Sequence, residues 1–114
     1  MSTPRFGLKE TVIEKLCRVF AKYPQVSKAV LYGSRAKGNY KNGSDIDLTL
    51  HGGADLTPNI LYKILDDIDD LLLPYTVDLS IYRTLNDPDF IDHIQRVGIT
   101  FYDKSERVTE LAGA

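Results

Sequence analysis

Apolar residues recur at helical spacing in three stretches of the chain. Those from Leu8 to Phe20 lie four residues apart and predict an amphipathic helix over about residues 8–22. Two further helices each begin with a residue suited to cap a helix, followed by a proline: Thr57-Pro58 and Asp87-Pro88. Apolar stripes follow both pairs and end near Pro74 and Gly98, so we expect helices over about residues 57–73 and 87–98.

Short runs between these helices show the patterns of β-strands. Val26 to Tyr32 is largely apolar and stops at Gly33, which predicts a strand that runs into a turn. Residues 45–50 and 76–82 alternate polar and apolar side chains, and residues 99–102 could form a last edge strand. Turn-forming residues over 38–44 indicate a loop, preceded by a short helical turn after Ser34.

The strict alternation in residues 45–50 places Asp45 and Asp47 on one face of their strand, because successive side chains of a strand point to opposite faces. The rise of a strand separates their positions by about 7 Å. Asp78 has the same context in the strand at 76–82. If the two strands are neighbours, these three carboxylates converge on one site.

Strands that alternate with helices predict an α/β fold, here a two-layer mixed β-sheet with helices on one face. The sheet should be mixed because the tight passage around residues 33–45 joins two strands without a long crossover. The length predicts a single domain over residues 1–114, with about residues 103–114 as a tail that is frayed or bound to a partner.

Charge and composition narrow the class of protein. With 14 basic and 16 acidic residues the formal net charge is −2, so no overall positive field favours direct binding to nucleic acid. A single cysteine, Cys17, excludes an internal disulfide framework and fits a reducing compartment. No apolar signal core or membrane-spanning stretch is visible, so we expect a cytoplasmic protein with no membrane contact.

Gly33 and Ser34 stand where a nucleoside triphosphate could be held. A glycine after a strand lets backbone N–H groups approach an anion closely, and the helix start that follows adds a partial positive charge. Ser34 adds a hydroxyl donor, and Arg35 and Lys37 either reach phosphate oxygens or face water. Arg35 is the better candidate because its planar guanidinium matches phosphate geometry.

Asp45, Asp47 and Asp78 are candidate ligands for Mg²⁺, which prefers one or two carboxylates together with substrate phosphates. Such a set could hold two metal ions that stabilise the attacking and the leaving oxygen of a transfer reaction. Asp78 would then also be placed to take the proton of an acceptor hydroxyl.

Three segments resemble the nucleotidyltransferase superfamily of the DNA polymerase β type, in its minimal stand-alone branch: Leu31-Tyr32-Gly33-Ser34-Arg35-Ala36-Lys37-Gly38, Ser44-Asp45-Ile46-Asp47-Leu48 and Val77-Asp78-Leu79. Ten residues separate Ser34 from Asp45, which matches the Gly-Ser, ten-residue gap, Asp-x-Asp pattern of that branch.

The resemblance covers nearly the whole chain and implies a polymerase β palm-like fold, ATP as substrate and Mg²⁺ at the three aspartates. It also implies a set of nucleotide-binding residues: Gly33, Ser34, Arg35, Lys37 and Ser44. Lys37 departs from the pattern, because many relatives carry arginine there and lysine loses bidentate phosphate contact.

The resemblance further implies a helical partner. Minimal nucleotidyltransferases are often encoded beside a small all-helical HEPN protein, and some are antitoxins that transfer AMP from ATP to a tyrosine of that RNase partner. A chain of 114 residues leaves little room for an acceptor-binding domain, so we expect the acceptor site to come from a partner protein or from a homodimer. Two alternatives stay open: an antitoxin with an idle site that neutralises its partner by binding, and a nucleotidyltransferase that acts on a small molecule or RNA.

Several other polar residues are assigned no chemistry. Aspartates 66, 67, 69 and 70 are expected on the solvated face of a helix. His51 and His93 have no second histidine or cysteine at metal-ligand spacing, and Cys17 lies next to the apolar stripe of the first helix, where we expect it to pack. Most tyrosines are expected to pack, and Tyr82 is the one to watch because it shares a predicted face with Asp78.

Overall fold

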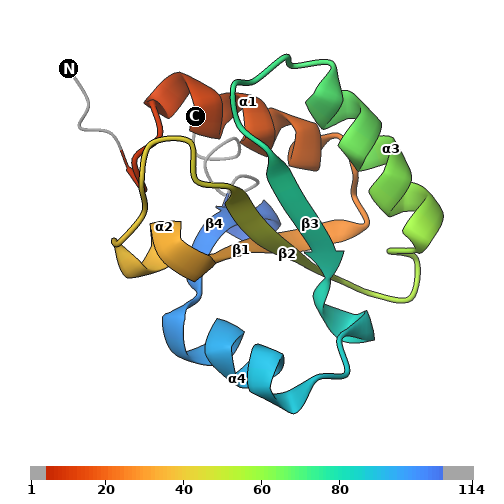
Figure 1. The fold of residues 1–114 in the computed structure, drawn as a ribbon. Coiled ribbons are helices and arrows are strands. Elements are labelled where there is room, and N and C mark those ends of the chain that lie inside the picture. The colour runs from red at the N-terminus through yellow and green to blue at the C-terminus, as the bar shows by residue number, and fades with distance from the viewer. Residues whose placement is uncertain (1–4, 107–114) are drawn as a thin grey trace.

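The computed structural model describes residues 5–106, which form a sheet flanked by helices (Figure 1). The helices are α1 (Glu10–Ala21), α2 (Gly33–Lys37), α3 (Pro58–Asp69) and α4 (Pro88–Val97), with a 3-10 turn η1 (Tyr82–Thr84). The strands are β1 (Val26–Tyr32), β2 (Ile46–Gly52), β3 (Val77–Ile81) and β4 (Ile99–Asp103). Each predicted helix and strand is present, with boundaries shifted by a few residues.

Both caps predicted from the sequence form. Thr57 Oγ1 accepts a hydrogen bond from the Ile60 N–H at 3.4 Å, and Asp87 Oδ1 accepts one from the Asp89 N–H at 3.0 Å. The prolines at positions 58 and 88 leave no unsatisfied donor, because proline has no N–H. The starts of α3 and α4 were predictable because capping depends on residues a few positions apart.

The sheet is mixed, with strand order β3-β2-β1-β4. β1 runs antiparallel to both β2 and β4, whereas β2 and β3 are parallel. The crossover through α3 makes the parallel pairing possible, since parallel strands need a long connection. The register pairs Asp47 with both Asp78 on β3 and Tyr32 on β1.

The two faces of the sheet carry different side chains. α1 and α3 lie over one face (Figure 1), where leucines 31, 48 and 50 have no exposed surface. α4 lies on the opposite side and packs Ile94 against Val30 and Tyr32. The two-layer mixed sheet is therefore confirmed for α1 and α3. α4 adds cover on the second face, because Val30 and Tyr32 point away from the main core.

The end of the chain differs from the predicted tail. Asp103 is the last residue of β4 and pairs with Lys28. Beyond it, the backbone N–H and the hydroxyl of Ser105 donate to Asp103 Oδ1 at 2.9 and 2.7 Å. The expectation for residues 107–114 lies outside the described residues. Within residues 5–106, no helix is both long enough and apolar enough to span a bilayer.

Candidate active site

Asp47 and Asp78 lie next to each other on the sheet face that α1 and α3 leave uncovered. They are paired in register on the parallel strands β2 and β3. Neighbouring strands lie about 4.8 Å apart, and side chains in register point to the same face. Asp47 is half-buried and Asp78 is exposed. One carboxylate is thus sheltered while the other faces solvent.

Asp45 is placed differently from the prediction that it belongs to a strand. β2 begins at Ile46, so Asp45 is the last residue of the preceding loop, and it is exposed. Its charge still acts on Asp47, whose pKa is raised first by burial and then by the charges of Asp78 and Asp45. Arg35 and His93 oppose this shift. The three aspartates therefore interact around Asp47, and a bound cation would relieve their repulsion.

These carboxylates fit a cation that takes only part of its coordination from protein. Among residues 5–106, no three His, Cys, Asp or Glu side chains are grouped closely enough to hold a metal ion by themselves. Mg²⁺ uses one or two carboxylates and completes its shell with water and substrate phosphate oxygens. Asp47 and Asp78 supply that number of hard oxygen ligands, so the donor set suits Mg²⁺ in the presence of a phosphate.

Gly33 brings the backbone directly against Asp47. Its φ of +75° lies in the left-handed region that favours glycine. A Cβ atom added there would lie 2.4 Å from Asp47 Oδ2, so a side chain would displace the carboxylate. Ser34 follows, half-buried in the first turn of α2. The predicted phosphate-binding turn is thus in contact with the predicted metal ligand.

Arg35 has a different role from the one that its sequence position suggested. Its side chain is only 3% exposed. Nε and Nη2 donate to the Ser44 carbonyl at 3.2 and 2.7 Å, and Nη1 donates to the Phe6 carbonyl at 2.9 Å. The guanidinium carbon also lies 5.3 and 5.1 Å from the ring centroids of Tyr40 and Tyr75. The structure corrects the expected phosphate contact: Arg35 fastens the loop that leads to Asp45.

Ser44 and Lys37 complete the predicted nucleotide set. Ser44 Oγ accepts a hydrogen bond from the Lys41 N–H at 2.9 Å, and the Ser44 carbonyl is held by Arg35. Ser44 thereby closes a turn of the loop, and its nucleotide contact stays a prediction. Lys37 ends α2 and is exposed, so its ammonium faces solvent near the Gly33 turn.

Tyr32 and His93 border the carboxylates, although the sequence did not single them out. The pKa of Tyr32 is raised to about 12, first by burial and then by the charges of Asp78 and Asp47, against a hydrogen bond with Ser80. His93, on α4, meets the Tyr32 ring edge-on, with centroids 6.2 Å apart. Alternation in β1 was the available signal for Tyr32. No sequence signal placed His93, because its position depends on how α4 crosses the sheet.

Tyr82 does not join the carboxylates. Its ring stacks on His51 with centroids 4.4 Å apart, and its hydroxyl accepts a hydrogen bond from Gln95 at 3.0 Å. Burial and Lys28 lower the pKa of His51. These residues occupy the same sheet face as Asp78, farther along the strands.

Most of the residues to which the sequence assigned no chemistry lie where they were expected. The side chains of Asp66, Asp69 and Asp70 are exposed, as expected. Asp67 differs, because it accepts a hydrogen bond from the Tyr23 hydroxyl at 2.6 Å and so ties α3 to the end of α1. Cys17 is half-buried on α1, with Sγ 3.6 Å from the Phe101 carbonyl.

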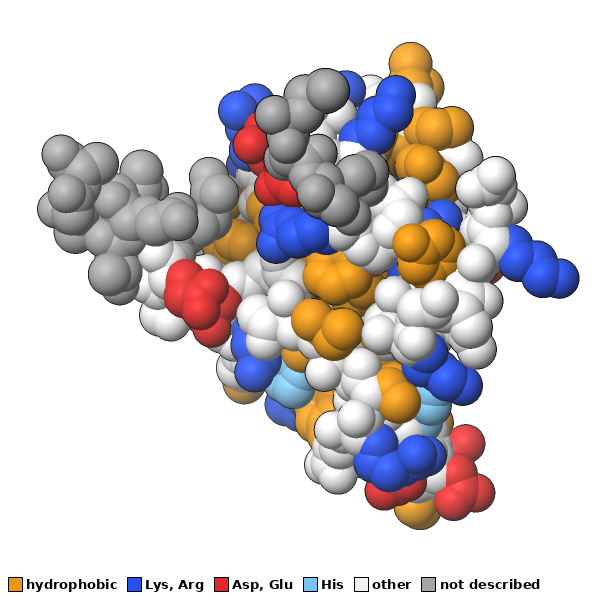
Figure 2. Space-filling view, turned by 90° about the vertical axis from the view of Figure 1, so that its left-hand side faces the viewer, with side chains coloured by type: hydrophobic (Ala, Val, Ile, Leu, Met, Phe, Trp, Pro, Cys, Tyr) orange, Lys and Arg blue, Asp and Glu red, His pale blue; other side chains and the backbone are white. Residues whose placement is uncertain are grey.

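Surface charge gives no sign of a nucleic-acid groove on the side of the molecule seen in Figure 2. Lys and Arg side chains are scattered there among apolar and acidic ones, and the described residues on this side form no continuous basic surface. Binding to phosphate backbones needs clustered positive charge. The described part of this side therefore lacks the clustered positive charge that such binding uses.

A family model described as polymerase beta, nucleotidyltransferase matches residues 14–107. The chain belongs to this family. The matched range contains the Gly33 turn and all three aspartates of the candidate site. No curated protein sequence matches the chain.

Solved structures share the fold of this nucleotidyltransferase. A crystal structure of a toxin-antitoxin with AMP-PNP aligns with a TM-score of 0.64 at 19% identity, over 93% of this chain and 89% of the matched chain. A complex of tri-AMPylated Shewanella oneidensis HEPN toxin with MNT antitoxin aligns with a TM-score of 0.62 at 15% identity, over 90% and 79% of the two chains. The toxin-antitoxin MntA-HepT aligns with a TM-score of 0.62 at 15% identity, over 87% and 76%. At such identities the likeness shows the fold alone.

Proposed function

We propose that this nucleotidyltransferase transfers AMP from ATP to a hydroxyl, in particular a tyrosine hydroxyl, of a HEPN-type helical partner, in the cytoplasm. It would thereby act as the antitoxin of a toxin-antitoxin pair. The observation that carries the chemistry is the in-register pair Asp47 and Asp78 beside the Gly33 turn. Two carboxylates of the kind that Mg²⁺ prefers thus lie beside a glycine turn of the kind that can hold a phosphate, which supports the proposal.

Each residue of the site has a defined task in this proposal. Asp47 and Asp78 would hold Mg²⁺, and the nearby charge of Asp45 would add to the attraction for the cation. The bound cation would neutralise the charge of the phosphate oxygens. The backbone at Gly33 and the Ser34 hydroxyl hold the triphosphate in line with the acceptor. Exposed Asp78 is the carboxylate that an incoming hydroxyl meets, and it accepts the proton of that hydroxyl. The hydroxyl oxygen bonds to the α-phosphorus of ATP as the bond from that phosphorus to the β-phosphate oxygen breaks, and pyrophosphate leaves.

The partner is supported by the structures that share the fold. One of them contains a toxin-antitoxin with AMP-PNP, and another contains an AMPylated HEPN toxin with an MNT antitoxin. This chain aligns with 89% and 79% of the length of the two matched chains. An acceptor on a separate helical protein is therefore the simplest arrangement for this site.

A second candidate function is inhibition by binding alone. It is favoured by the exposed position of Asp45 in the loop before β2, apart from the in-register pair Asp47 and Asp78. An antitoxin of this kind would silence its partner at equal stoichiometry without ATP. The transfer reaction would then be dispensable.

Intact mass spectrometry of the proposed HEPN-type partner tests both functions. The partner is incubated with the chain, ATP and Mg²⁺, and in parallel with EDTA in place of Mg²⁺. We expect the partner to gain one or more AMP masses only with the wild type and Mg²⁺. Tandem mass spectrometry then identifies whether a tyrosine carries the AMP.

The matched control is Asp45→Ala/Asp47→Ala, which removes two carboxylates without touching the main core. It should leave the partner mass unchanged while circular dichroism shows an intact fold. A partner that gains no mass with the wild type, yet loses its RNase activity in a stable complex, would establish inhibition by binding instead.

A further inference from the structure

The end of α3 places acidic residues where a helix disfavours them. Aspartates 66, 67 and 69 lie in the last turns of α3, Asp70 is its C-cap, and the last turn contains no basic residue. The C-terminus of a helix carries partial negative charge, so carboxylates there are destabilising. Asp67 has a compensating hydrogen bond from Tyr23, whereas Asp66, Asp69 and Asp70 face solvent. Local stability does not explain this acidic end.

Leu72, just beyond this acidic end, is also unfavourably placed. Its φ of +54° lies in the left-handed region, which a leucine side chain disfavours, and the residue is 88% exposed. Glycine or asparagine would suit such a turn better. Backbone strain of this kind is found preferentially at functional positions.

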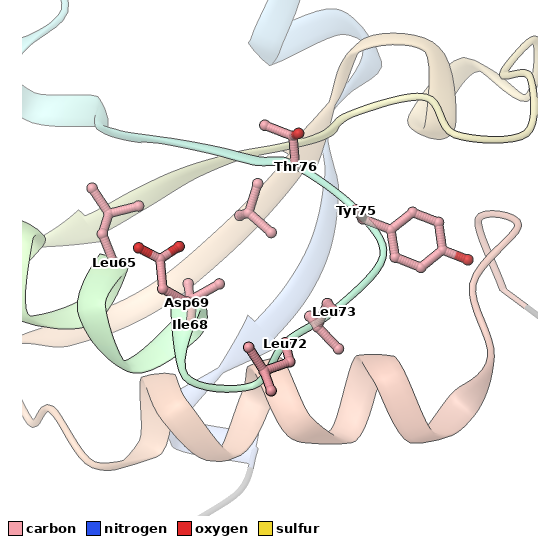
Figure 3. A pocket seen from close by; sticks show the side chains of 8 residues that line it. Leu65, Ile68, Asp69, Leu72, Leu73, Tyr75 and Thr76 are labelled. Carbon is pink, nitrogen blue, oxygen red and sulfur yellow. The ribbon is translucent and has the colours of Figure 1, made fainter.

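Leu72 borders a cavity of about 320 Å³ between the end of α3 and the start of β3 (Figure 3). Leu65, Ile68 and Val77 contribute apolar lining, and Asp69 is the charged residue among those that line it. Tyr62, which is 62% exposed, lies one helical turn before Leu65 and extends the apolar surface along α3. We call the cavity with Asp69 and Leu72 the Leu72 surface.

The Leu72 surface adjoins the candidate active site along the chain. Tyr75, Thr76 and Val77 line the cavity and lead directly to Asp78 on β3. β3 is an edge strand of the sheet, so nothing in the sheet lies outside it within the described residues. The rise of a strand places Asp78 roughly 10 Å or less from these residues. A protein bound at the Leu72 surface would therefore reach past the edge to Asp78.

We propose that the Leu72 surface docks the protein whose hydroxyl is modified. The occupant is a basic amphipathic segment: an apolar side chain enters the cavity, and a Lys or Arg beside it pairs with Asp69 and Asp66. Acidic rim charge and apolar lining together select that chemistry, and the same charge repels RNA. The inference rests on the proposed function, because it assigns this surface to the acceptor protein.

Isothermal titration calorimetry of the helical partner against this chain tests the docking surface, without ATP or Mg²⁺ so that transfer plays no part. Leu72→Gly removes the apolar anchor and suits the left-handed backbone, so the variant should keep the Tm of the wild type while its Kd for the partner rises at least tenfold. Asp69→Lys should also raise the Kd at least tenfold, although a lysine at this helix end favours the isolated fold. Loss of binding without loss of stability separates docking from a structural role.

Two controls match these variants at other places. Ile99→Ala removes a partly exposed apolar side chain from β4, at the opposite edge of the sheet. Asp55→Lys reverses an exposed carboxylate in the loop before α3. Both should bind the partner as the wild type does. A wild-type Kd for Leu72→Gly, or equal losses in the two controls, would overturn the proposal.

The remaining outcomes separate this inference from the proposed chemistry. If the wild type modifies the partner but Leu72→Gly modifies and binds it equally well, the docking surface is wrong and the transferase stands. If size-exclusion chromatography with light scattering shows a dimer that Leu72→Gly converts to a monomer, a second copy occupies the surface and the partner assignment fails. If no AMP is transferred but Leu72→Gly still abolishes binding, docking stands and the transfer proposal fails.

Discussion

The two faces of the central sheet use the same strands for different purposes. On β2, the side chains of Leu48 and Leu50 point toward α1 and α3 and are fully buried. Asp47, on the same strand, points to the opposite face and is half-buried. The covered face stabilises the fold by removing apolar surface from water. The carboxylate face concentrates charge that works against stability. A single alternating strand thus contributes to both the core and the candidate site, with the two sets of side chains one residue apart.

The carboxylate face is itself divided into a closed and an open part. Thr49 is fully buried and its hydroxyl accepts a hydrogen bond from Ser80 at 2.9 Å, which closes the middle of the face. At the N-terminal ends of β2 and β3, Asp47 lies half-buried against Gly33 and its neighbour Asp78 is exposed. Thr49 and Ser80 satisfy each other's hydrogen bonding and so stabilise the fold. Asp47 and Asp78 repel each other, and a bound cation would relieve that repulsion.

The largest effect on activity is expected from a substitution on the carboxylate face that leaves the core unchanged. Asp47→Asn keeps the shape of the side chain but removes the charge of a proposed metal ligand. We expect AMP transfer to fall by roughly 10³-fold, because several kcal/mol of metal-dependent stabilisation are lost. Initial rates measured by mass spectrometry would show this, with Tm unchanged or higher. An active Asp47→Asn protein would remove Asp47 from the site.

The opposite face responds to Leu48→Ala, one residue away. Truncating a fully buried leucine should lower the free energy of unfolding by about 2–5 kcal/mol, through lost burial and the cavity left behind. Urea denaturation measures the loss. At a temperature where the variant is folded, its KM for ATP should match that of the wild type. A changed KM with unchanged stability would contradict the division between the faces.

Arg35 connects the fold to the site, so its replacement should affect both. Arg35→Lys keeps the charge but cannot reproduce hydrogen bonds to the Ser44 and Phe6 carbonyls together. The unfolding free energy should fall by about 1.5–3 kcal/mol, the range for charged hydrogen bonds. If Arg35 acts by positioning the loop that ends at Asp45, kcat should fall more than KM rises. A large rise in the KM for ATP with unchanged kcat would instead support a direct contact between Arg35 and the phosphates of ATP.

The smallest effect is a pH dependence of stability. The folded-state pKa of Asp47 is raised, so in metal-free protein this group costs stability once pH exceeds its folded pKa. As pH falls from that value toward the ordinary aspartate pKa, the folded state takes up the proton first and the cost disappears. Calorimetry should therefore show Asp47→Asn with a higher Tm than the wild type at pH 7 and the same Tm near pH 3. If the variant and the wild type had equal Tm values at pH 7 as well as at pH 3, the pKa of Asp47 would not be raised in the folded state.

Local patterns were sufficient to predict most of the secondary structure. The caps at Thr57 and Asp87, the turn at Gly33 and the alternation through Asp47 each depend on residues within a few positions, and all are present in the structure. The exceptions lie where an element meets its neighbours. Asp103 joins β4 instead of a tail because β1 supplies a pairing partner, and Asp45 leaves β2 because the Arg35 contacts hold the loop before it.

Periodicity acts over single turns and pleats, so the pattern of residues was enough to predict the elements and the shared carboxylate face of β2 and β3. The pairing of Asp47 with Asp78, the contact of His93 with Tyr32 and the burial of Arg35 depend instead on how distant segments pack together. A guanidinium after a Gly-Ser turn has several possible partners. Buried carbonyls from distant segments attract it more strongly than solvent does, and no spacing in the sequence records which carbonyls will be there.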